Sequence, residues 1–136
     1  MHQQLGDENI FLFGLTTEQV NQRKRDGYRP HEIYLHDQDI KRVLDQISAG
    51  FGDKVTYNDL TQRLLFGAGG SQADEYMLLA DFNSYRDAHR RAIEAYADRD
   101  RWNRMSLVNI ARSGIFAADR SIQDYARDIW HVPTRK

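Results

Sequence analysis

The apolar residues of this 136-residue chain recur mostly with the spacing of helices that bury one side. The clearest case lies near the end of the chain, where the spacing i, i+3, i+4, i+7, i+8 is occupied by Ile122, Tyr125, Ala126, Ile129 and Trp130. This stripe predicts a helix with a single buried face, capped near Asp119 or Ser121. The helix before it is predicted to end at Ser113-Gly114, since glycine commonly follows a helix.

A different pattern occupies the start of the chain. Four consecutive apolar residues, Ile10 to Phe13, lie between a polar stretch and Gly14. An uninterrupted run of this length is typical of a short strand that is buried on both faces inside an α/β sheet. Such a strand needs neighbours for its backbone hydrogen bonds, and this chain offers few. We therefore expect part of the sheet to lie elsewhere.

Helical signals dominate residues 16–65. Thr16 or Thr17 is expected to cap a short helix, with Gln19 as the reciprocal residue and an end near Asp26-Gly27. Pro30 marks the next helix start. A further apolar face, stopped by Gly50, is formed by Ile40, Val43, Leu44 and Ile47. Another helix is predicted over 58–65, buried through Leu60, Leu64 and Leu65.

The remaining elements are predicted from residue 67 onward. Residues 67–75 read as a flexible surface loop, and Tyr76–Ala80 as a short extended segment. Asp81 is expected to cap a long helix that carries on one side Phe82, Tyr85, His89, Ala92 and Tyr96. The next helix carries Trp102, Met105 and Val108, and the last one ends before Pro133. The fold class is thus mainly α with one or two short strands, in a single unit over residues 1–136.

Composition and charge argue against some classes of function. The chain has 19 basic and 20 acidic residues, so its net charge of -1 gives no general attraction to nucleic acid or anionic membranes. The basic clusters 23–25 and 86–91 are diluted by nearby acids, which favours solvated helix faces. There is no cysteine, no signal segment and no apolar run of membrane-spanning length. These features predict a cytoplasmic protein that binds neither membranes nor nucleic acid.

Two motifs that suggest chemistry are weak. The histidines His31 and His36 are five residues apart, so on a helix they face different ways and do not make a zinc pair with Glu32. The loop Gly67–Ser71 lacks the Gly-Lys-Ser/Thr ending of a P-loop, and Gln72 stands where a dinucleotide fingerprint needs glycine. Nothing in these patterns assigns a metal or a cofactor to the chain.

Several short motifs, taken in order, resemble the C-terminal end of the glycogen (α-glucan) phosphorylases. Glu8–Gly14 is similar to that family's Glu-Asn-x-Phe-x-Phe-Gly strand, and Gln46–Phe51 is similar to its Gln-Ile-Ser-x-Gly-Phe. Ala80-Asp81-Phe82 with Tyr85 matches Ala-Asp-(Tyr/Phe)-x-x-Tyr, and the block 109–130 follows in the same order. The resemblance covers nearly the whole chain. The departures, at 67–70 and 23–25, fall on predicted surface.

The resemblance implies a fold, a reaction and a cofactor for a longer protein. The fold would be the C-terminal portion of a Rossmann-like domain in a two-domain, GT-B type glycosyltransferase. Such enzymes release glucose 1-phosphate from α-1,4-glucans with inorganic phosphate and carry pyridoxal phosphate on a lysine. That lysine motif precedes Glu8 in family order, and none of Lys24, Lys41, Lys54 and Lys136 matches it. No catalytic, cofactor-binding or metal residue is therefore assigned here, and the chain alone is expected to be inactive.

The role expected of this segment is structural. The resemblance implies that its final helices close a domain and dock on the rest of the phosphorylase chain, or else self-associate when alone. The predicted structural and docking residues are Phe11, Phe13, Trp102, Ile122, Tyr125, Ile129 and Trp130. The alternative is a stand-alone helical module with a binding or regulatory role, or the remnant of a truncated gene.

Overall fold

The computed structural model describes residues 2–133. Chain contacts divide the protein into two compact units, one formed by Phe13–His89 and the other by Met1–Leu12 with Arg90–Lys136. The single unit expected over residues 1–136 stays a prediction.

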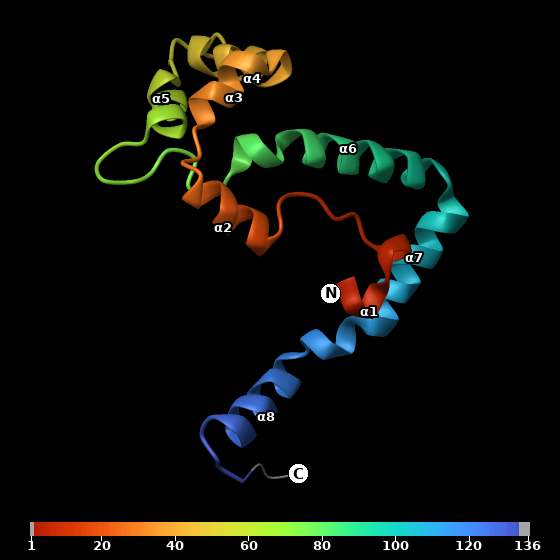
Figure 1. The fold of residues 1–136 in the computed structure, drawn as a ribbon. Helices are drawn as coiled ribbons and strands as arrows, with labels where there is room; N and C mark the ends of the chain where they lie inside the picture. The colour runs from red at the N-terminus through yellow and green to blue at the C-terminus, as the bar shows by residue number, and fades with distance from the viewer. Residues whose placement is uncertain (1, 134–136) are drawn as a thin grey trace. The chain divides into compact units, whose positions relative to one another are not determined.

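Helices account for nearly all regular structure in the described residues (Figure 1). In chain order they are α1 (His2–Leu5), η1 (Asp7–Asn9), α2 (Thr17–Arg25), α3 (Pro30–His36), α4 (Gln38–Ala49), α5 (Asn58–Phe66), α6 (Leu78–Ala97), α7 (Arg99–Arg112), η2 (Ser113–Phe116) and α8 (Ala118–Asp128). The mainly helical class is confirmed. Between residues 2 and 133, no helix combines the length and the hydrophobicity that a bilayer crossing requires.

Local signals fix most helix ends in the Phe13–His89 unit. Thr16 and Gln19 form the predicted capping box at the start of α2, which ends at Arg25 with Asp26 as its C-terminal cap. Pro30 is the first residue of α3, as predicted. Gly50 ends α4 with φ of 85°, and an added Cβ there would lie 2.2 Å from the carbonyl oxygen of Val55. Glycine is therefore required at this turn for both conformation and space.

The core of this unit lies between α3, α4, α5 and the start of α6. Its buried residues are Ile40, Leu44, Leu65 and Leu79, with Ile33, Tyr34, Ile47, Leu64 and Phe82 packed against them. The predicted faces of α4 and α5 are confirmed except at Leu60, which is 59% exposed. The buried residues of α5 are Thr61 and Leu65, and Leu60 lies about 140° around the helix from Leu65.

The start of α6 differs from the prediction. Tyr76–Ala80 is not an extended segment, because α6 begins at Leu78, and Asp81 does not cap it. Asp74, only 3% exposed, accepts hydrogen bonds from the backbone N–H groups of Leu78 at 2.7 Å and Leu79 at 2.9 Å. Asp74 therefore accepts N–H groups in the first turn of α6 that would otherwise lack partners. Asp81 is not needed as a cap and makes a contact elsewhere.

Asp81 instead holds a distant part of the same unit. Its carboxylate accepts the N–H of Leu15 at 2.8 Å, and Ser84 Oγ accepts the N–H of Gly14 at 3.0 Å. Gly14 has φ of 89°, and an added Cβ would lie 2.8 Å from Asp81 Oδ2. The glycine that ends the apolar run is therefore required by this close approach.

The strand predicted over Ile10–Phe13 does not form in the described structure. The segment is extended at Ile10, with φ of -146° and ψ of 146°, but no neighbouring strand pairs with it. Among residues 2–133 the β-type pairing consists of an isolated bridge between Ala68 and Ser71. That bridge closes a tight turn in the loop 67–75, whose flexibility stays a prediction.

The second unit is built on α7. Both α1 and η1 contact α7, and in Figure 1 the red α1 lies against the light blue α7. Leu5, Ala95 and Met105 are its buried apolar residues on α1, α6 and α7. The α7 helix ends at Arg112 as predicted. The start of α8 differs, because Ala117 and not Asp119 or Ser121 is the residue before the helix, without a side-chain cap.

Candidate docking site

The last turn of α8 brings two aromatic side chains together. The helix ends at Asp128, and the N–H groups of Ile129 and Trp130 both donate to the carbonyl oxygen of Tyr125, at 3.0 and 2.9 Å. The chain then turns through His131, which has φ of 51°. This turn stacks the ring of Trp130 on that of Tyr125, with centroids 5.8 Å apart.

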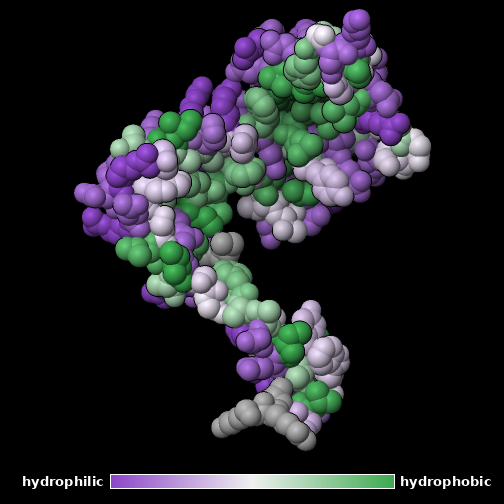
Figure 2. Space-filling model, turned by 180° about the vertical axis from the view of Figure 1, so that it is seen from behind, coloured by the Kyte–Doolittle hydropathy of each residue, from purple (hydrophilic) through white to green (hydrophobic). Residues whose placement is uncertain are grey.

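Most of the predicted apolar stripe of α8 is exposed to solvent in this chain. Ala126 is buried, whereas the other four residues are each 50–59% exposed. We call Ile122, Tyr125, Ile129 and Trp130 the α8 patch. Figure 2 shows hydrophobic surface on α8, next to a hydrophilic flank. Contiguous exposed apolar side chains of this kind mark interaction sites more often than isolated ones do.

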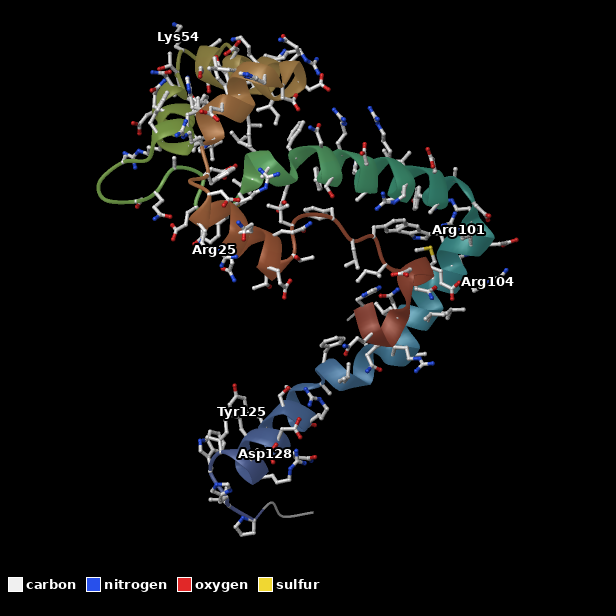
Figure 3. The ribbon with its side chains drawn as sticks, viewed as in Figure 1. Arg25, Lys54, Arg101, Arg104, Tyr125 and Asp128 are labelled. Atoms are coloured by element: carbon white, nitrogen blue, oxygen red, sulfur yellow. The ribbon has the colours of Figure 1, made fainter. Side chains whose placement is uncertain are left out.

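The flank of the α8 patch is a charge network that is neutralised within the helix. Arg120 pairs with Asp124, and Arg127 donates to Asp124 at 2.8 Å and to Asp128 at 2.6 Å. The hydrogen bond from Arg127 holds the pKa of Asp128 below its usual range, and both carboxylates raise the pKa of Arg127. An open cavity of about 380 Å³ lies between the patch and this network, and Figure 3 shows Tyr125 and Asp128 on α8. Any partner of the patch thus meets apolar and aromatic groups beside paired charges.

Phe11 and Trp102 pack within their own unit. Their rings stack with centroids 6.3 Å apart, and Tyr96 meets Trp102 edge-on at 5.1 Å. The guanidinium of Arg99 lies 3.9 Å from the ring centre of Tyr96, which extends the cluster by a cation–π contact. Trp102 lies on α7, the helix predicted to carry it. These aromatics join the N-terminal segment to α7, and a docking role for them stays a prediction.

Phe13 belongs to the other unit. Its ring meets Tyr85 of α6 edge-on at 5.1 Å, and Tyr85 stacks on His89 at 6.0 Å. The structure therefore separates the predicted docking residues into two kinds. Phe11, Phe13 and Trp102 have aromatic partners along the described chain, whereas Tyr125 and Trp130 of the α8 patch stack on each other.

Sequence reasoning missed the side chains that hold the N-terminal segment. Asn109 of α7 donates to the carbonyl oxygen of Asn9 at 3.0 Å, and Arg91 of α6 donates to that of Leu12 at 3.1 Å. These pairs are separated by 100 and 79 residues. No local pattern signals such contacts, because asparagine and arginine on a helix surface are ordinary.

Two adjoining cavities beside α7 carry mixed charge. They measure about 360 and 570 Å³ and share Glu8 and Arg101 in their linings. Figure 3 shows Arg101 and Arg104 on α7, but the larger cavity is also lined by three acids, Glu8, Asp98 and Asp100. Acids outnumber the arginines there, so this is not the one-sided positive site that a phosphate group requires.

The described residues offer no cluster of side chains for a metal ion. Between residues 2 and 133, no group of three or more His, Asp or Glu side chains is placed to hold a metal ion. His31 lies with its ring 4.9 Å from Phe66 and 6.1 Å from Tyr34, a packing role at the edge of the core.

The lysines of the described chain do not fit pyridoxal phosphate. A lysine that forms a Schiff base is activated by a lowered pKa. Lys41 instead donates to Asp45 at 2.8 Å and to Tyr34 at 3.0 Å, and the hydrogen bond to Asp45 raises its pKa. Lys24 and Lys54 are exposed, and Lys136 lies outside the described residues.

The fold is thus that of a helical protein segment with an exposed apolar patch, beside charged side chains that form ion pairs with one another. Its family follows from comparison with known proteins. The family model for carbohydrate phosphorylases matches residues 1–132, and the chain belongs to this family.

Curated relatives agree with this assignment. The chain is 40% identical to the glycogen phosphorylase of Synechocystis over 97% of its length, and 41% identical to that of Chlamydia pneumoniae over 99%. It is 34% identical to the muscle form of glycogen phosphorylase from Bos taurus over its whole length. The matched stretch is only 15–16% of each of these relatives. The chain therefore corresponds to a fragment of an α-glucan phosphorylase.

Proposed function

We propose that this chain is the C-terminal segment of an α-glucan phosphorylase, and that the complete enzyme releases glucose 1-phosphate from α-1,4-glucans. The observation that supports this proposal is the match of the family model to residues 1–132. The chain covers only about 15% of the length of the relatives that it matches. In this reaction the glycosidic bond at C1 of the terminal glucose breaks and a bond from C1 to a phosphate oxygen forms. A proton passes to the oxygen of the departing glucan.

The catalytic groups of the proposed enzyme would lie outside this sequence. Phosphorylases are generally dependent on pyridoxal phosphate. The raised pKa of Lys41 and the exposure of Lys24 and Lys54 support a cofactor site elsewhere in the longer chain. A cytoplasmic location is part of the proposal, and the lack of cysteine supports a fold that does not depend on disulfides.

The proposed role of the segment is to dock on the rest of that enzyme through the α8 patch. Burying one large apolar side chain stabilises a protein by roughly 1.5–3 kcal/mol relative to leaving it exposed. Four half-exposed side chains on one face at the end of α8 therefore offer a substantial docking energy. The neutralised charges beside the patch support this role, because paired charges cost less to bring against a protein surface than lone ones.

The test is an activity assay on a chimera. The matched 15% of the Synechocystis glycogen phosphorylase is replaced by this chain, and release of glucose 1-phosphate from glycogen and phosphate is measured. We expect activity within about tenfold of the parent enzyme, and none from the isolated 136-residue chain. A folded but inactive chimera would contradict the proposal and favour a separate binding module.

A further inference from the structure

A small cavity opens between the helices α3, α4 and α5. These helices pack on one another within the Phe13–His89 unit and lie side by side in Figure 1. The cavity measures about 300 Å³, which is at the lower end of the range for small-molecule sites. We call it the α3–α5 pocket, and residues of all three helices line it.

One face of α5 supplies much of this lining. Its lining residues follow the spacing i, i+3, i+4, i+7, i+8 and are Asn58, Thr61, Gln62, Leu65 and Phe66. Thr61 and Leu65 are buried, and the hydroxyl groups of Thr61 and Ser48 share a hydrogen bond of 2.6 Å. The hydroxyls inside the pocket therefore already have partners, and free polar groups must come from its exposed residues.

The amide side chains of Asn58 and Gln62 are such free groups. Both residues are exposed, and neither amide forms a hydrogen bond within residues 2–133. They are four residues apart, so they lie one turn apart on the same face of α5. Each amide carries two N–H donors and one carbonyl acceptor. The pair can therefore bind hydroxyl groups, which both donate and accept hydrogen bonds.

Aromatic rings border the same pocket. The ring of Phe66 lies 4.9 Å from that of His31, which stacks in turn on Tyr34 at 6.1 Å. Phe66 is nonetheless 58% exposed, so much of its ring is left open by the described chain. The face of an aromatic ring is partly negative and attracts the weakly positive C–H groups of a ligand. Phe66 thus offers a flat apolar surface near the two amides.

The lining of the pocket favours an uncharged ligand. Among its described lining residues, Asp45 alone carries a formal charge when histidine is neutral. The carboxylate of Asp45 accepts hydrogen bonds from Lys41 at 2.8 Å and from the hydroxyl of Tyr34 at 2.7 Å. A phosphate group would find no cation in the lining, and a cation would find one carboxylate that is already paired.

We propose that the α3–α5 pocket binds a glucose residue of an α-1,4-glucan. A sugar ring has C–H groups that fit Phe66 and neutral hydroxyl groups that fit Asn58 and Gln62. The inference rests on the proposed function for the identity of the sugar, since the complete enzyme acts on this polymer. The role of the pocket is to hold the glucan, because the cofactor and the catalytic groups lie outside this sequence.

An NMR titration of the isotope-labelled 136-residue chain with maltoheptaose tests the site. The side-chain amide signals of Asn58 and Gln62 should shift and saturate, with a Kd of about 1 mM. Glucose should bind about tenfold more weakly, because it lacks the neighbouring residues that contact the rim of the pocket. No saturable shift at about 20 mM maltoheptaose would overturn the proposal. Glucose binding as tight as that of maltoheptaose would overturn the glucan as the ligand.

Three substitutions on α5 locate the binding. Phe66→Ala and Gln62→Ala each remove one proposed contact from an exposed residue, so the fold should survive both. Each should weaken the binding of maltoheptaose about tenfold. Leu60→Ala removes an equally exposed side chain, at 59%, outside the pocket and should leave the Kd unchanged. An unchanged Kd in either pocket variant, or an equal loss in Leu60→Ala, would overturn the site.

The binding and activity results fail independently. An active Synechocystis chimera together with a 136-residue chain that binds no maltoheptaose would overturn the site and leave the proposed function standing. An inactive chimera together with saturable binding to the pocket would support the site and contradict the function.

Discussion

The hydroxyl of Tyr28 donates a 2.6 Å hydrogen bond to Oδ2 of Asp74, a carboxylate that is only 3% exposed. The same carboxylate accepts the N–H groups of Leu78 and Leu79. One side chain therefore joins the connection between α2 and α3 to the first turn of α6. This link spans 46 residues and fixes where the longest helix of the Phe13–His89 unit begins.

Removing the tyrosine hydroxyl should destabilise this unit. Tyr28→Phe leaves Asp74 with one partner fewer, and we expect the free energy of unfolding to fall by about 1–2 kcal/mol. Urea denaturation measures this change. Tyr57→Phe is the matched control, because Tyr57 donates to Asp53 at 2.8 Å on the exposed surface. Equal losses in the two variants would contradict a special role for Asp74.

The same link predicts a loss of stability at alkaline pH. Burial raises the pKa of Tyr28, and the hydrogen bond to Asp74 adds to this effect. A pKa that is higher in the folded state means that folding favours the neutral phenol. Its contribution is complete below the ordinary tyrosine pKa of about 10 and falls as the pH rises above it.

Denaturation at pH 8, 9, 10 and 11 measures this slope. We expect Tyr28→Phe to remove most of it. Tyr57→Phe should remove less, because the pKa of Tyr57 is raised mainly by its exposed hydrogen bond to Asp53. A wild-type slope that survives in Tyr28→Phe would show that another group titrates.

Two aliphatic positions test where the core lies. Ile40 is 1% exposed, so Ile40→Ala should lower the free energy of unfolding by about 2–5 kcal/mol through a lost contact and a cavity. Leu60→Ala removes a side chain that is 59% exposed and should cost less than about 1 kcal/mol. Comparable costs would mean that Leu60 is covered, as the sequence pattern predicts.

The open α8 patch should make the isolated chain self-associate. Sedimentation velocity is expected to show a dimer or larger species, because four exposed apolar side chains lie together at the end of α8. The double variant Ile122→Ser with Ile129→Ser should shift the chain toward monomer. Asp119→Ser, on the same helix outside the patch, should leave the distribution unchanged. A wild-type monomer at all concentrations would contradict this prediction.

Local sequence signals predict much of the fold. The capping box at Thr16 and Gln19, the helix start at Pro30 and the stop at Gly50 depend on neighbouring residues, and the structure confirms them. The spacing of apolar residues on α4 likewise identifies Ile40 and Leu44 as core residues.

The features that sequence reasoning missed depend on distant residues. Asp81 precedes a helical pattern and resembles a cap, yet it binds the N–H of Leu15, 66 residues away. Asp74 is a local exception, because it caps α6 from four residues before Leu78, within a loop whose composition suggests only flexibility. The strand at Ile10–Phe13 is absent because a strand exists only with neighbours, which these described residues do not supply.

The residues of the α8 patch could be predicted from the sequence, but their exposure to solvent could not. The stripe that includes Ile122 and Tyr125 is evident from spacing, and spacing alone predicts burial. Whether a stripe is covered depends on what packs against it, which spacing does not encode. The stacking of Trp130 on Tyr125 also arises from the turn after Asp128 and not from a helical repeat.

The most direct test of the central claim is the size of the native polypeptide that contains this sequence. An antibody raised against the 136-residue chain is used to probe an extract of the cells that produce it, and the mass of the protein detected is measured. Since the matched stretch is about 15% of each relative, we predict a polypeptide six to seven times as long as this chain. A native protein of 15.9 kDa would contradict the account and make this chain an independent protein.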